Sequence, residues 1–332
     1  MSPGFSEDEL VAALRKVLSG EAPGVRIGIG DDAAVVEPGS GDLVLTADAL
    51  IEGVHFERDS LAARDLGYKA IVVNVSDVAA MAASPRFALV TLGLSAGTDV
   101  PWVVELYGGM RTACEEYAVS LVGGDLSRSA EIVVAVTVTG VVAAGREVRR
   151  SGAKPGQRLV VTGSLGAAAG GIELSKAADK RVLATDWGRG LLHAHSRPVA
   201  RVGEAQVLAA HGTSAMIDIS DGLAKDLSRL CAESGAGARL SLAAVPIARE
   251  LGDLARTIPV NPLELALSGG EDYELLATLD ANEVAGATED LKERFGVALT
   301  DVGEVSEKGL VAVLPDGTER PLEPRGWDHF AG

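Results

Sequence analysis

The sequence predicts a two-domain protein in which an N-terminal α/β half, with helices layered on a sheet, precedes a C-terminal α+β half. The chain has 332 residues, about twice the usual length of one domain. An apolar fraction of 47% and 40 glycines suit a packed protein with many tight turns between strands and helices. Strand-like and helix-like patterns also alternate along the first half, which is typical of layered α/β architecture.

The N-terminal half is expected to begin with a helix over residues 6–19. Ser6 can cap this helix, Glu9 follows three residues later as in a capping box, and apolar residues then recur at helical spacing. A second helix is expected over 62–83, and Pro101 is placed to open a third. The expected strands of this half cover residues 43–48, 86–94, 119–125 and 131–142.

A polar and basic stretch, 143–157, has no periodicity and contains a Lys-Pro-Gly turn, so we expect the domain boundary there. The N-terminal domain is then 1–145 and the C-terminal domain 146–332. Ser220 is expected to cap an amphipathic helix in the second half. Other helices are expected directly after residue 164 and near 198–211, whereas 176–196 gives only weak signals. The expected strands are 158–164, 214–220, 238–245, 273–279, 298–305 and 310–314.

Composition excludes several classes of partner. A formal net charge of −17 argues against nucleic acid, because binding to a phosphate backbone depends on clustered Lys and Arg. No run of about 18 uncharged apolar residues occurs, so no membrane span or membrane partner is expected. The first residues lack the basic and then apolar order of a secretory signal, which predicts a cytoplasmic protein. Cys114 and Cys231 lie far apart in the sequence and are expected to be reduced and inert.

Aspartates recur in similar local contexts, at the end of a strand or the start of a loop or helix, among small residues. A single aspartate in such a place is usually a turn former or a helix cap. Their recurrence instead suggests one shared site, and carboxylate oxygens are the ligands that Mg²⁺ prefers. The residues concerned are Asp31, Asp32, Asp48, Asp77, Asp125, Asp218 and Asp221.

Such a site predicts a Mg-dependent enzyme that binds ATP and transfers its terminal phosphoryl group. Carboxylates alone would repel a triphosphate, but bridging cations turn them into a means of holding it. The transfer itself needs in-line positioning and neutralisation of charge, and no protein nucleophile. The sequence contains no P-loop motif, no complete dinucleotide-binding glycine motif and no HRD or DFG motif of protein kinases, so ATP is expected to bind in another way.

Eight motifs, spread in order over nearly the whole chain, resemble the thiamine-monophosphate kinase family. Any one of them is weak evidence, whereas eight in register are highly specific. They are GIGDDAAVV, TADALIEGVHF (46–56), KAIVVNVSDVAAMAA (69–83), LVGGDLSR (121–128), RRSGAKPGQ (149–157), IDISDGL (217–223), LSGGEDYEL (267–275) and GWDHF (326–330).

The resemblance implies the two-domain fold of the aminoimidazole-ribonucleotide-synthetase-like ATP-binding superfamily. It implies a homodimer in which the N-terminal sheets of two subunits join across the interface. The implied reaction converts thiamine monophosphate and ATP into thiamine diphosphate and ADP, with Mg²⁺ as the metal. The N-terminal domain would bind ATP and metal and form the dimer, and the C-terminal domain would complete the nucleotide and substrate site.

Site residues are carried over from the family motifs position by position. The positions that match its Mg ligands are Asp32, Thr46, Ala47, Asp48, Asp77, Asp125, Asp218 and Asp221. Of these, Asp48, Asp125 and Asp218 are expected to serve catalysis most directly. The positions that match ATP contacts are Tyr107, Gly124, Asp125, Arg150 and Ser220, and those that match substrate contacts are His55, Glu271 and Trp327.

The implied roles agree with the chemistry of the side chains. Arg150 offers a forked donor for phosphate oxygens. Trp327 offers a flat face for the aminopyrimidine or thiazolium of thiamine, and Glu271 can accept from an exocyclic amine. Ala47 departs from the many relatives that carry Thr or Ser there, so only its backbone carbonyl could bind metal. Taken singly, His55, Trp327 and Arg150 are more simply explained as packing or surface residues.

Other activities remain as alternatives. Selenophosphate synthetase would carry a reactive Cys or selenocysteine near its N-terminus, and the hydrogenase-maturation relative would end in a reactive Cys, unlike this chain. Aminoimidazole-ribonucleotide synthetase remains the alternative within the superfamily, although GWDHF is not expected at its end. From a different class, the aspartates could belong to a non-catalytic cation-binding or scaffold protein, but calcium modules keep their ligands in one short loop.

Overall fold

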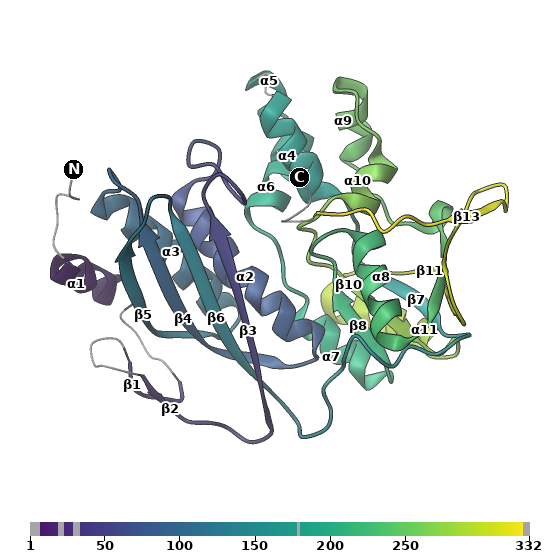
Figure 1. The fold of residues 1–332 in the computed structure, drawn as a ribbon, viewed down its shortest axis with the longest axis horizontal. Helices are drawn as coiled ribbons and strands as arrows, with labels where there is room; N and C mark the ends of the chain where they lie inside the picture. The colour runs from purple at the N-terminus through teal and green to yellow at the C-terminus, as the bar shows by residue number, and fades with distance from the viewer. Residues whose placement is uncertain (1–6, 19–22, 29–33, 178–179, 328–332) are drawn as a thin grey trace. The chain divides into compact units, whose positions relative to one another are not determined.

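A computed structural model describes residues 7–18, 23–28, 34–177 and 180–327 of the chain. The chain divides into two compact units, which Figure 1 shows as ribbons. Unit 1 comprises residues 1–78 and 83–146, and unit 2 comprises residues 79–82 and 147–332. No helix in the described residues is both long and apolar enough to cross a membrane.

Unit 1 is built around a four-stranded sheet with strand order β3-β6-β4-β5. β3 pairs with β6 and β6 with β4 in antiparallel fashion, whereas β4 and β5 run parallel. Figure 1 shows α2 and α3 on one face of this sheet. The elements are α1 (Glu7–Val17), β1 (Val25–Ile27), β2 (Val35–Val36), β3 (Asp42–Ile51), α2 (Ala63–Ala80), β4 (Ser84–Leu94), α3 (Val100–Glu116), β5 (Ser120–Arg128) and β6 (Val133–Val142).

Glycines allow the two helices of this layer to cross closely. A Cβ on Gly67 of α2 would lie 1.8 Å from the carbonyl oxygen of Leu106, and one on Gly109 of α3 would lie 1.7 Å from that of Arg64. Asp99 caps α3 by accepting from the backbone N–H of Trp102 at 2.9 Å. The predicted opening of this helix by Pro101 is confirmed, since Pro is compatible with the first helical turn.

Unit 2 contains a seven-stranded sheet with strand order β13-β12-β9-β11-β7-β10-β8. All neighbours are antiparallel except β12 and β9. The strands are β7 (Arg158–Thr162), β8 (Ala215–Asp218), β9 (Gly237–Ser241), β10 (Leu275–Leu279), β11 (Leu299–Ser306), β12 (Leu310–Val313) and β13 (Glu319–Pro321). The helices are α4 (Ala167–Ala177), α5 (Lys180–Leu183), α6 (Asp186–Ser196), α7 (Val202–Ala210), α8 (Leu223–Ser234), η1 (Leu242–Ala244), α9 (Leu251–Thr257), α10 (Pro262–Ser268) and α11 (Val284–Phe295).

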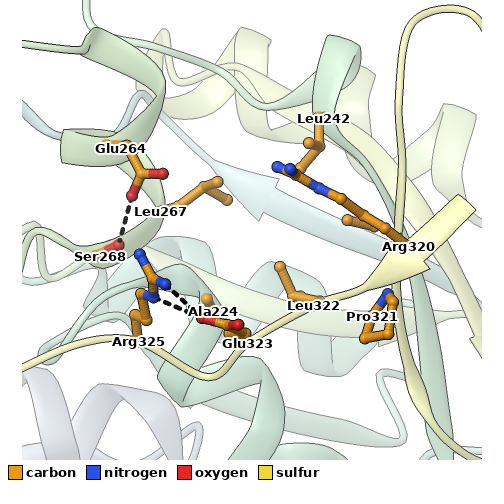
Figure 2. Close-up of a pocket in the computed structure, with 11 residues that line it drawn as sticks. Ala224, Leu242, Glu264, Leu267, Ser268, Arg320, Pro321, Leu322, Glu323 and Arg325 are labelled. Atoms are coloured by element: carbon orange, nitrogen blue, oxygen red, sulfur yellow. Dashed lines mark hydrogen bonds and ion pairs between the residues drawn. The ribbon is translucent and has the colours of Figure 1, made fainter.

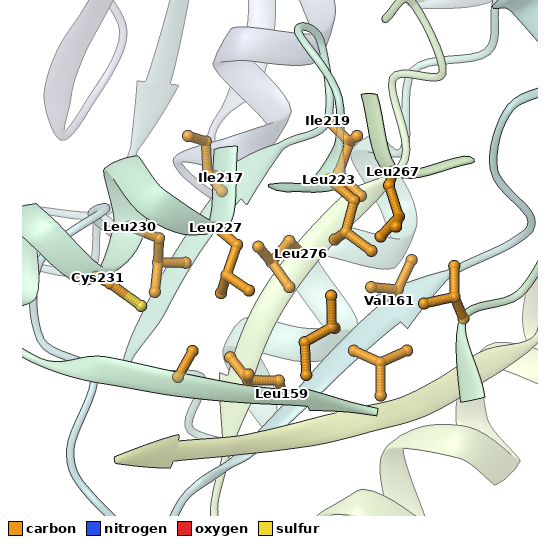
Figure 3. Packing of buried hydrophobic residues seen from close by; sticks show 14 of the residues in the cluster. Leu159, Val161, Ile217, Ile219, Leu223, Leu227, Leu230, Cys231, Leu267 and Leu276 are labelled. Carbon is orange, nitrogen blue, oxygen red and sulfur yellow. The ribbon is translucent and has the colours of Figure 1, made fainter. Parts of the chain in front are cut away.

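The central strands of unit 2 are buried on both faces. On one face, Leu159, Val161 and Ile217 pack with the apolar side of α8, as Figure 3 shows. Val160 and Met216, the intervening residues, pack on the other face with α7 and α11. Near-continuous apolar strands such as 158–162 and 275–279 follow from this burial, because both faces of the pleat need apolar side chains.

The predicted two-domain fold, with an α/β first half and an α+β second half, is confirmed by this architecture. The predicted strands correspond to β3 to β12 within a few residues at each end. The predicted cap Ser6 lies outside the described residues. Both cysteines are buried and free, and burial raises the pKa of the Cys114 thiol to about 12 and that of Cys231 to about 11. Such thiols stay protonated near neutral pH and are poor nucleophiles.

The predicted cap of α8 is wrong. Gly222, with a φ of 117°, occupies the N-cap position, and it makes no side-chain capping hydrogen bond. The carboxylate of Asp226, inside the helix, instead accepts from the backbone N–H groups of Ser220, Asp221 and Gly222. The backbone N–H groups just before α8 therefore donate to a side chain in the first turn of the helix itself.

Candidate functional site

In unit 1, four candidate metal ligands lie on β3 and the helix α2: Thr46, Ala47, Asp48 and Asp77. The Thr46 hydroxyl donates to Asp77 Oδ2 at 2.6 Å. β3 is an edge strand, and on its unpaired side the backbone N–H of Asp48 donates to Asn74 Oδ1 at 3.0 Å. Asn74 is fully buried and its own amide donates to Ala70, so its orientation is fixed. Asn74 therefore holds the strand segment that carries Thr46 and Asp48 against α2.

Asp125 and Gly124 lie on β5, at the opposite edge of the same sheet. Asp48 is in register with Val136, Val136 with Val90, and Val90 with Gly124, so two strands separate the aspartates. At a strand spacing of about 4.8 Å, their backbones are roughly 14 Å apart. One ion cannot bridge that distance. Within unit 1, the expectation of a single shared cluster is therefore replaced by two acidic positions at opposite edges.

Gly124 allows a close approach between β5 and β4. A Cβ at this position would lie 1.8 Å from the carbonyl oxygen of Val90. The exposed carboxylate of Asp125 accepts from the Ser127 hydroxyl at 2.8 Å, which limits its rotation.

In unit 2, the candidate residues surround the loop 218–222, which joins β8 to α8. Asp218 ends β8 with 2% of its surface exposed. Asp226, fully buried, accepts from three successive backbone N–H groups of the loop at 2.9 to 3.1 Å. Burial raises the pKa of Asp226, and the N–H of Asp221 and the charge of Arg229 partly offset that rise. The loop is thus wrapped around one buried carboxyl group.

Two cations face the Asp221 carboxylate on this loop. Arg229 forms an ion pair with Asp221 at 2.5 Å and another with Asp226 at 2.7 Å. Lys225 lies 3.6 Å from Asp221. Neither cation was singled out from the sequence. The helical spacing of Asp226 and Arg229, three residues apart, and of Asp221 and Lys225, four apart, is the signal that could have identified them.

Two predicted substrate residues dock on the same loop. The backbone N–H of Glu271 donates to the Ser220 carbonyl at 2.8 Å, and that of Trp327 donates to the Asp221 carbonyl at 3.0 Å. Lys225 also donates to the Trp327 carbonyl. The Trp327 side chain remains 47% exposed. The structure therefore brings together Ser220, Asp221, Glu271 and Trp327, which lie more than 100 residues apart at the extremes.

The remaining candidates are placed singly. The His55 ring, in unit 1, accepts at Nδ1 from the backbone N–H of Ile51 at 3.1 Å, so a neutral ring carries its proton on Nε2. Tyr107 is buried in α3, and burial raises the pKa of its phenol. Arg150 is exposed. Ala47 is exposed on β3. Asp31 and Asp32 lie outside the described residues.

Within the described part of the chain, no group of three or more His, Cys, Asp or Glu side chains is arranged to hold a metal ion. The candidate donors are nonetheless all oxygens, which suits Mg²⁺ completed by water and phosphate oxygens rather than a closed protein cage. The arrangement can therefore contribute single carboxylates to metal ions that a bound phosphate chain would share.

Unit 2 contains a pocket of about 360 Å³ whose lining residues differ from the candidate site residues. Leu242, Leu267 and Leu322 form its apolar part, and Arg320 and Arg325 lie at its rim (Figure 2). The Arg325 guanidinium is paired with Glu323 at 2.6 Å. None of the predicted site residues lines this pocket. It therefore adds no support to their assignment.

Comparison with protein families and with individual proteins gives consistent matches. Residues 30–142 match the AIR synthase related protein N-terminal domain, and residues 154–314 match the corresponding C-terminal domain. Thiamine-monophosphate kinase of Aquifex aeolicus is 36% identical over 98% of this chain and 98% of its own length. The enzyme of Escherichia coli K12 is 36% identical over 92% of this chain and 93% of its own.

Solved structures agree with these matches. Thiamine-monophosphate kinase from Stenotrophomonas maltophilia K279a superposes with a TM-score of 0.81 at 33% identity, covering 96% of this chain and 98% of that one. AaThiL complexed with AMPPCP and TMP superposes with a TM-score of 0.78 at 36% identity, covering 98% and 97%. The hydrogenase maturation protein HypE in complex with ATP, at 20% identity and a TM-score of 0.77 over 97% and 95%, shares the fold.

Proposed function

The chain belongs to the thiamine-monophosphate kinase family of AIR synthase related proteins, and from this premise we propose that it phosphorylates thiamine monophosphate with ATP. The products are thiamine diphosphate and ADP, so the protein is a phosphotransferase with a phosphate group as acceptor. The alternative activities of the superfamily are not favoured, because curated relatives at 32 to 36% identity over more than nine tenths of the chain are thiamine-monophosphate kinases.

One observation of the structure carries the proposal furthest. Glu271 and Trp327, which match substrate contacts of the family, both donate backbone hydrogen bonds to the loop that bears Ser220 and Asp221. These last two match an ATP contact and a metal ligand. A phosphoryl acceptor held by the first pair would therefore be adjacent to the phosphates held by the second, as transfer between two bound substrates requires.

The acceptor contacts have side chains suited to thiamine. The Trp327 ring is half exposed and offers a face for an aromatic or cationic ring. The Glu271 carboxylate is partly exposed and can accept from an exocyclic amine of the aminopyrimidine. His55, with Nε2–H as donor, could bind an oxygen of the acceptor phosphate. These assignments support recognition of both the ring system and the phosphate.

The nucleotide contacts are proposed to be Tyr107, Gly124, Asp125, Arg150 and Ser220. The Arg150 guanidinium is exposed and has a forked donor geometry that fits phosphate oxygens. Gly124 keeps the backbone of β5 free of a side chain beside Asp125.

Mg²⁺ is the metal that fits this donor set. We propose Asp32, Thr46, Asp48, Asp77, Asp125, Asp218 and Asp221, with the carbonyl of Ala47, as its ligands. When bound, such ions neutralise the phosphate oxygens of ATP and of the acceptor. Because Asp48 and Asp125 lie at opposite sheet edges, they would serve different ions. Asp48, Asp125 and Asp218 are proposed as the catalytic carboxylates among this set.

Transfer is proposed to be direct and in line. An acceptor phosphate oxygen attacks the γ-phosphorus, the bond to the β,γ-bridging oxygen breaks, and ADP leaves with that oxygen. Such a transfer needs in-line positioning and neutralisation of charge, and no protein nucleophile. Inversion of configuration at a chiral γ-phosphate is the expected outcome, and retention would indicate a phospho-enzyme.

Unit 1 supports the proposal of a homodimer. Leu43 and Leu45 on β3 and Leu89 on β4 are 58%, 64% and 45% exposed on the sheet. Large apolar side chains gathered in this way mark interaction surfaces. A second copy of the chain, applying the same face, would bury them. The two free and buried cysteines are compatible with the reducing cytoplasm, which is where we propose that the enzyme works.

The test of this function is a product assay. Purified protein is incubated with ATP, Mg²⁺ and a panel of phosphomonoesters that includes thiamine monophosphate, and products are identified by mass spectrometry. We expect thiamine diphosphate and ADP in equal amounts, and no phosphorylation of the other esters. ADP without thiamine diphosphate, or preference for another ester, would overturn the proposal.

A further inference from the structure

A histidine from helix α6 contacts the carboxylate that is proposed to recognise the substrate. His195 Nδ1 lies 2.7 Å from Glu271 Oε2, across 76 residues of sequence. The His195 and Glu271 side chains keep only 16% and 20% of their surface exposed. A hydrogen bond this short and partly buried restricts the carboxylate more strongly than an exposed one. The contact lies wholly within unit 2.

We infer that His195 is a positioning residue that holds the Glu271 carboxylate for the aminopyrimidine of thiamine monophosphate, an inference that rests on the proposed function. His195 lies in the segment 176–196, to which the sequence motifs assign no role. It is not proposed to touch the substrate. Its action is to select one rotamer of Glu271 before the substrate binds.

The backbone at Glu271 is held firmly, but its side chain needs a further contact to be fixed in one rotamer. Glu271 and Tyr273 have φ angles of 69° and 52°, in the left-handed region that non-glycine residues seldom adopt. Their backbone N–H groups donate to the carbonyls of Ser220 and Ile219 at 2.8 and 2.9 Å. These bonds hold the main chain against the 218–222 loop, but they leave the rotamer of the long Glu271 side chain undetermined. Ordering it on substrate binding would cost entropy.

The neighbouring acids Asp272 and Glu274 have partners elsewhere in unit 2. Asp272 accepts from the backbone N–H of Gly166 at 2.8 Å, next to the start of α4. Glu274 is buried, accepts from the Thr162 hydroxyl at 2.6 Å and pairs with Arg201 at 2.5 Å. Of the three acids at 271, 272 and 274, Glu271 is the one whose position matches a substrate contact. Loss of the His195 contact would therefore be expected to affect substrate binding through Glu271.

Close packing of two helices brings His195 within reach. A Cβ on Gly171 of α4 would lie 2.3 Å from the Leu191 carbonyl oxygen and 3.1 Å from the His195 Cβ. Glycine at 171 therefore lets α6 approach α4. Thr185 caps α6 by accepting from the N–H of Gly188 at 3.1 Å, which fixes where the helix begins. His195 follows in the last turn of α6, and His193, two residues earlier, is exposed.

The chemistry of the contact suggests a conservative variant. An ionised Glu271 accepts, so His195 donates from Nδ1. The side-chain amide nitrogen of Asn and the Nδ1 atom of His are both two covalent bonds from Cβ, so His195→Asn can keep this donor. His195→Ala removes it. His193→Ala deletes a histidine of the same helix without touching the contact and is the matched control.

Steady-state kinetics on the full-length protein tests the inference. We expect His195→Ala to raise the KM for thiamine monophosphate about tenfold, as for loss of a hydrogen bond to a charged group. The KM for ATP should change by less than about twofold, because the nucleotide contacts are untouched. His195→Asn should recover most of the loss, and His193→Ala should match the wild type. Thermal melting checks that each variant is folded.

A double-mutant cycle separates positioning from a general structural effect. If His195 acts through Glu271, then His195→Ala has little further effect on the KM for thiamine monophosphate once Glu271→Gln is present. An unchanged KM in His195→Ala, equal increases in both KM values, or fully additive effects would overturn the inference. A wild-type protein that makes no thiamine diphosphate would instead overturn the proposed function, so the two failures are distinguishable.

Discussion

The four-stranded sheet of unit 1 exposes large apolar side chains, whereas the central strands of the seven-stranded sheet of unit 2 are packed on both faces. Leu43 and Leu45 project from β3 with more than half of their surface exposed. In unit 2, Leu159 and Val160 face opposite cores and both are fully buried. Unit 2 thus buries both faces of its central strands, whereas the sheet of unit 1 leaves large apolar side chains exposed.

The candidate residues differ between the units in the same way. In unit 1 they stand at opposite edges of the sheet, with Asp48 and Asp125 separated by two strands. In unit 2 they surround one loop, which Asp226 holds through three backbone hydrogen bonds. The candidate carboxylates of unit 1 are therefore separate from one another, whereas the candidate residues of unit 2 share one loop that hydrogen bonds hold in place.

The largest effect is expected at a unit 1 carboxylate. Asp125→Asn removes a charge from a proposed metal ligand while keeping its shape, so kcat/KM should fall by more than about a hundredfold. The melting temperature should stay near that of the wild type because Asp125 is exposed. Asp59→Asn, at another exposed aspartate of unit 1, is the matched control. Wild-type turnover in Asp125→Asn would remove the case for a metal-binding role.

The second largest effect is expected on the oligomeric state, from the exposed leucines of the unit 1 sheet. Leu45→Asp places a charge where a dimer would bury a leucine, so the protein should become monomeric in light scattering coupled to size exclusion. Val199→Asp alters a half-exposed apolar residue of unit 2 and should leave the dimer intact. A monomeric wild type, or a Leu45→Asp protein that remains dimeric, would refute the use of this face.

A backbone contact in unit 1 predicts a loss of stability. Gly124→Ala would place a Cβ about 1.8 Å from the Val90 carbonyl oxygen, so the strands would have to separate. We expect the free energy of unfolding, measured with denaturant, to fall by about 3 kcal/mol. In unit 2, Gly252→Ala in α9 meets no atom closer than 3.9 Å and should be neutral or stabilising. Equal stabilities of the two variants would contradict the close approach of β4 and β5.

The smallest effect is a pH dependence in unit 2. His211 lies 2.9 Å from Asp290 and 3.1 Å from Glu283, and the hydrogen bond with Asp290 is the main cause of its raised pKa. Because the folded pKa exceeds the unfolded one of about 6.5, the stabilisation is full below that pH. It is lost as the pH rises through the folded pKa.

Melting temperatures between pH 6 and 9 measure this contribution. The wild type should lose stability relative to His211→Gln as the pH rises, by less than about 1 kcal/mol for such a partly exposed group. His193→Gln, at an exposed histidine of α6, serves as the control for the loss of a histidine. A difference between wild type and His211→Gln that stays constant with pH would contradict the ion pairs.

Local sequence patterns predicted the elements with strong periodicity. The alternation of strands and helices in unit 1 is visible in the sequence, and Pro101 marks the start of α3. The two-sided burial of β10 agrees with its run of apolar residues. The helices α9, α10 and α11 were not predicted, because they are short or only partly apolar. The weak signals in 176–196 correspond to α6, whose His195 contacts a residue 76 positions away in the sequence.

The sequence motifs predicted which residues are candidates for the site, but the sequence did not predict how these residues are arranged in space. The motifs selected Glu271 and Trp327, and the structure docks both on the 218–222 loop. No local pattern indicates that Asp226, and not Ser220, would accept the hydrogen bonds of the loop. The three N–H groups of the loop come together at the Asp226 carboxylate only after folding. Nor does spacing along the chain reveal that two strands separate Asp48 from Asp125.

Binding of an ATP analogue with and without Mg²⁺ is the most direct test of the account. Isothermal titration of the wild-type protein with AMPPCP should give binding with Mg²⁺ and none without it, because the carboxylates repel a free triphosphate. Asp48→Asn should weaken the Mg-dependent binding by at least about tenfold. Equal binding in the absence of Mg²⁺, or unchanged affinity in Asp48→Asn, would contradict the claim that scattered aspartates hold the nucleotide through metal ions.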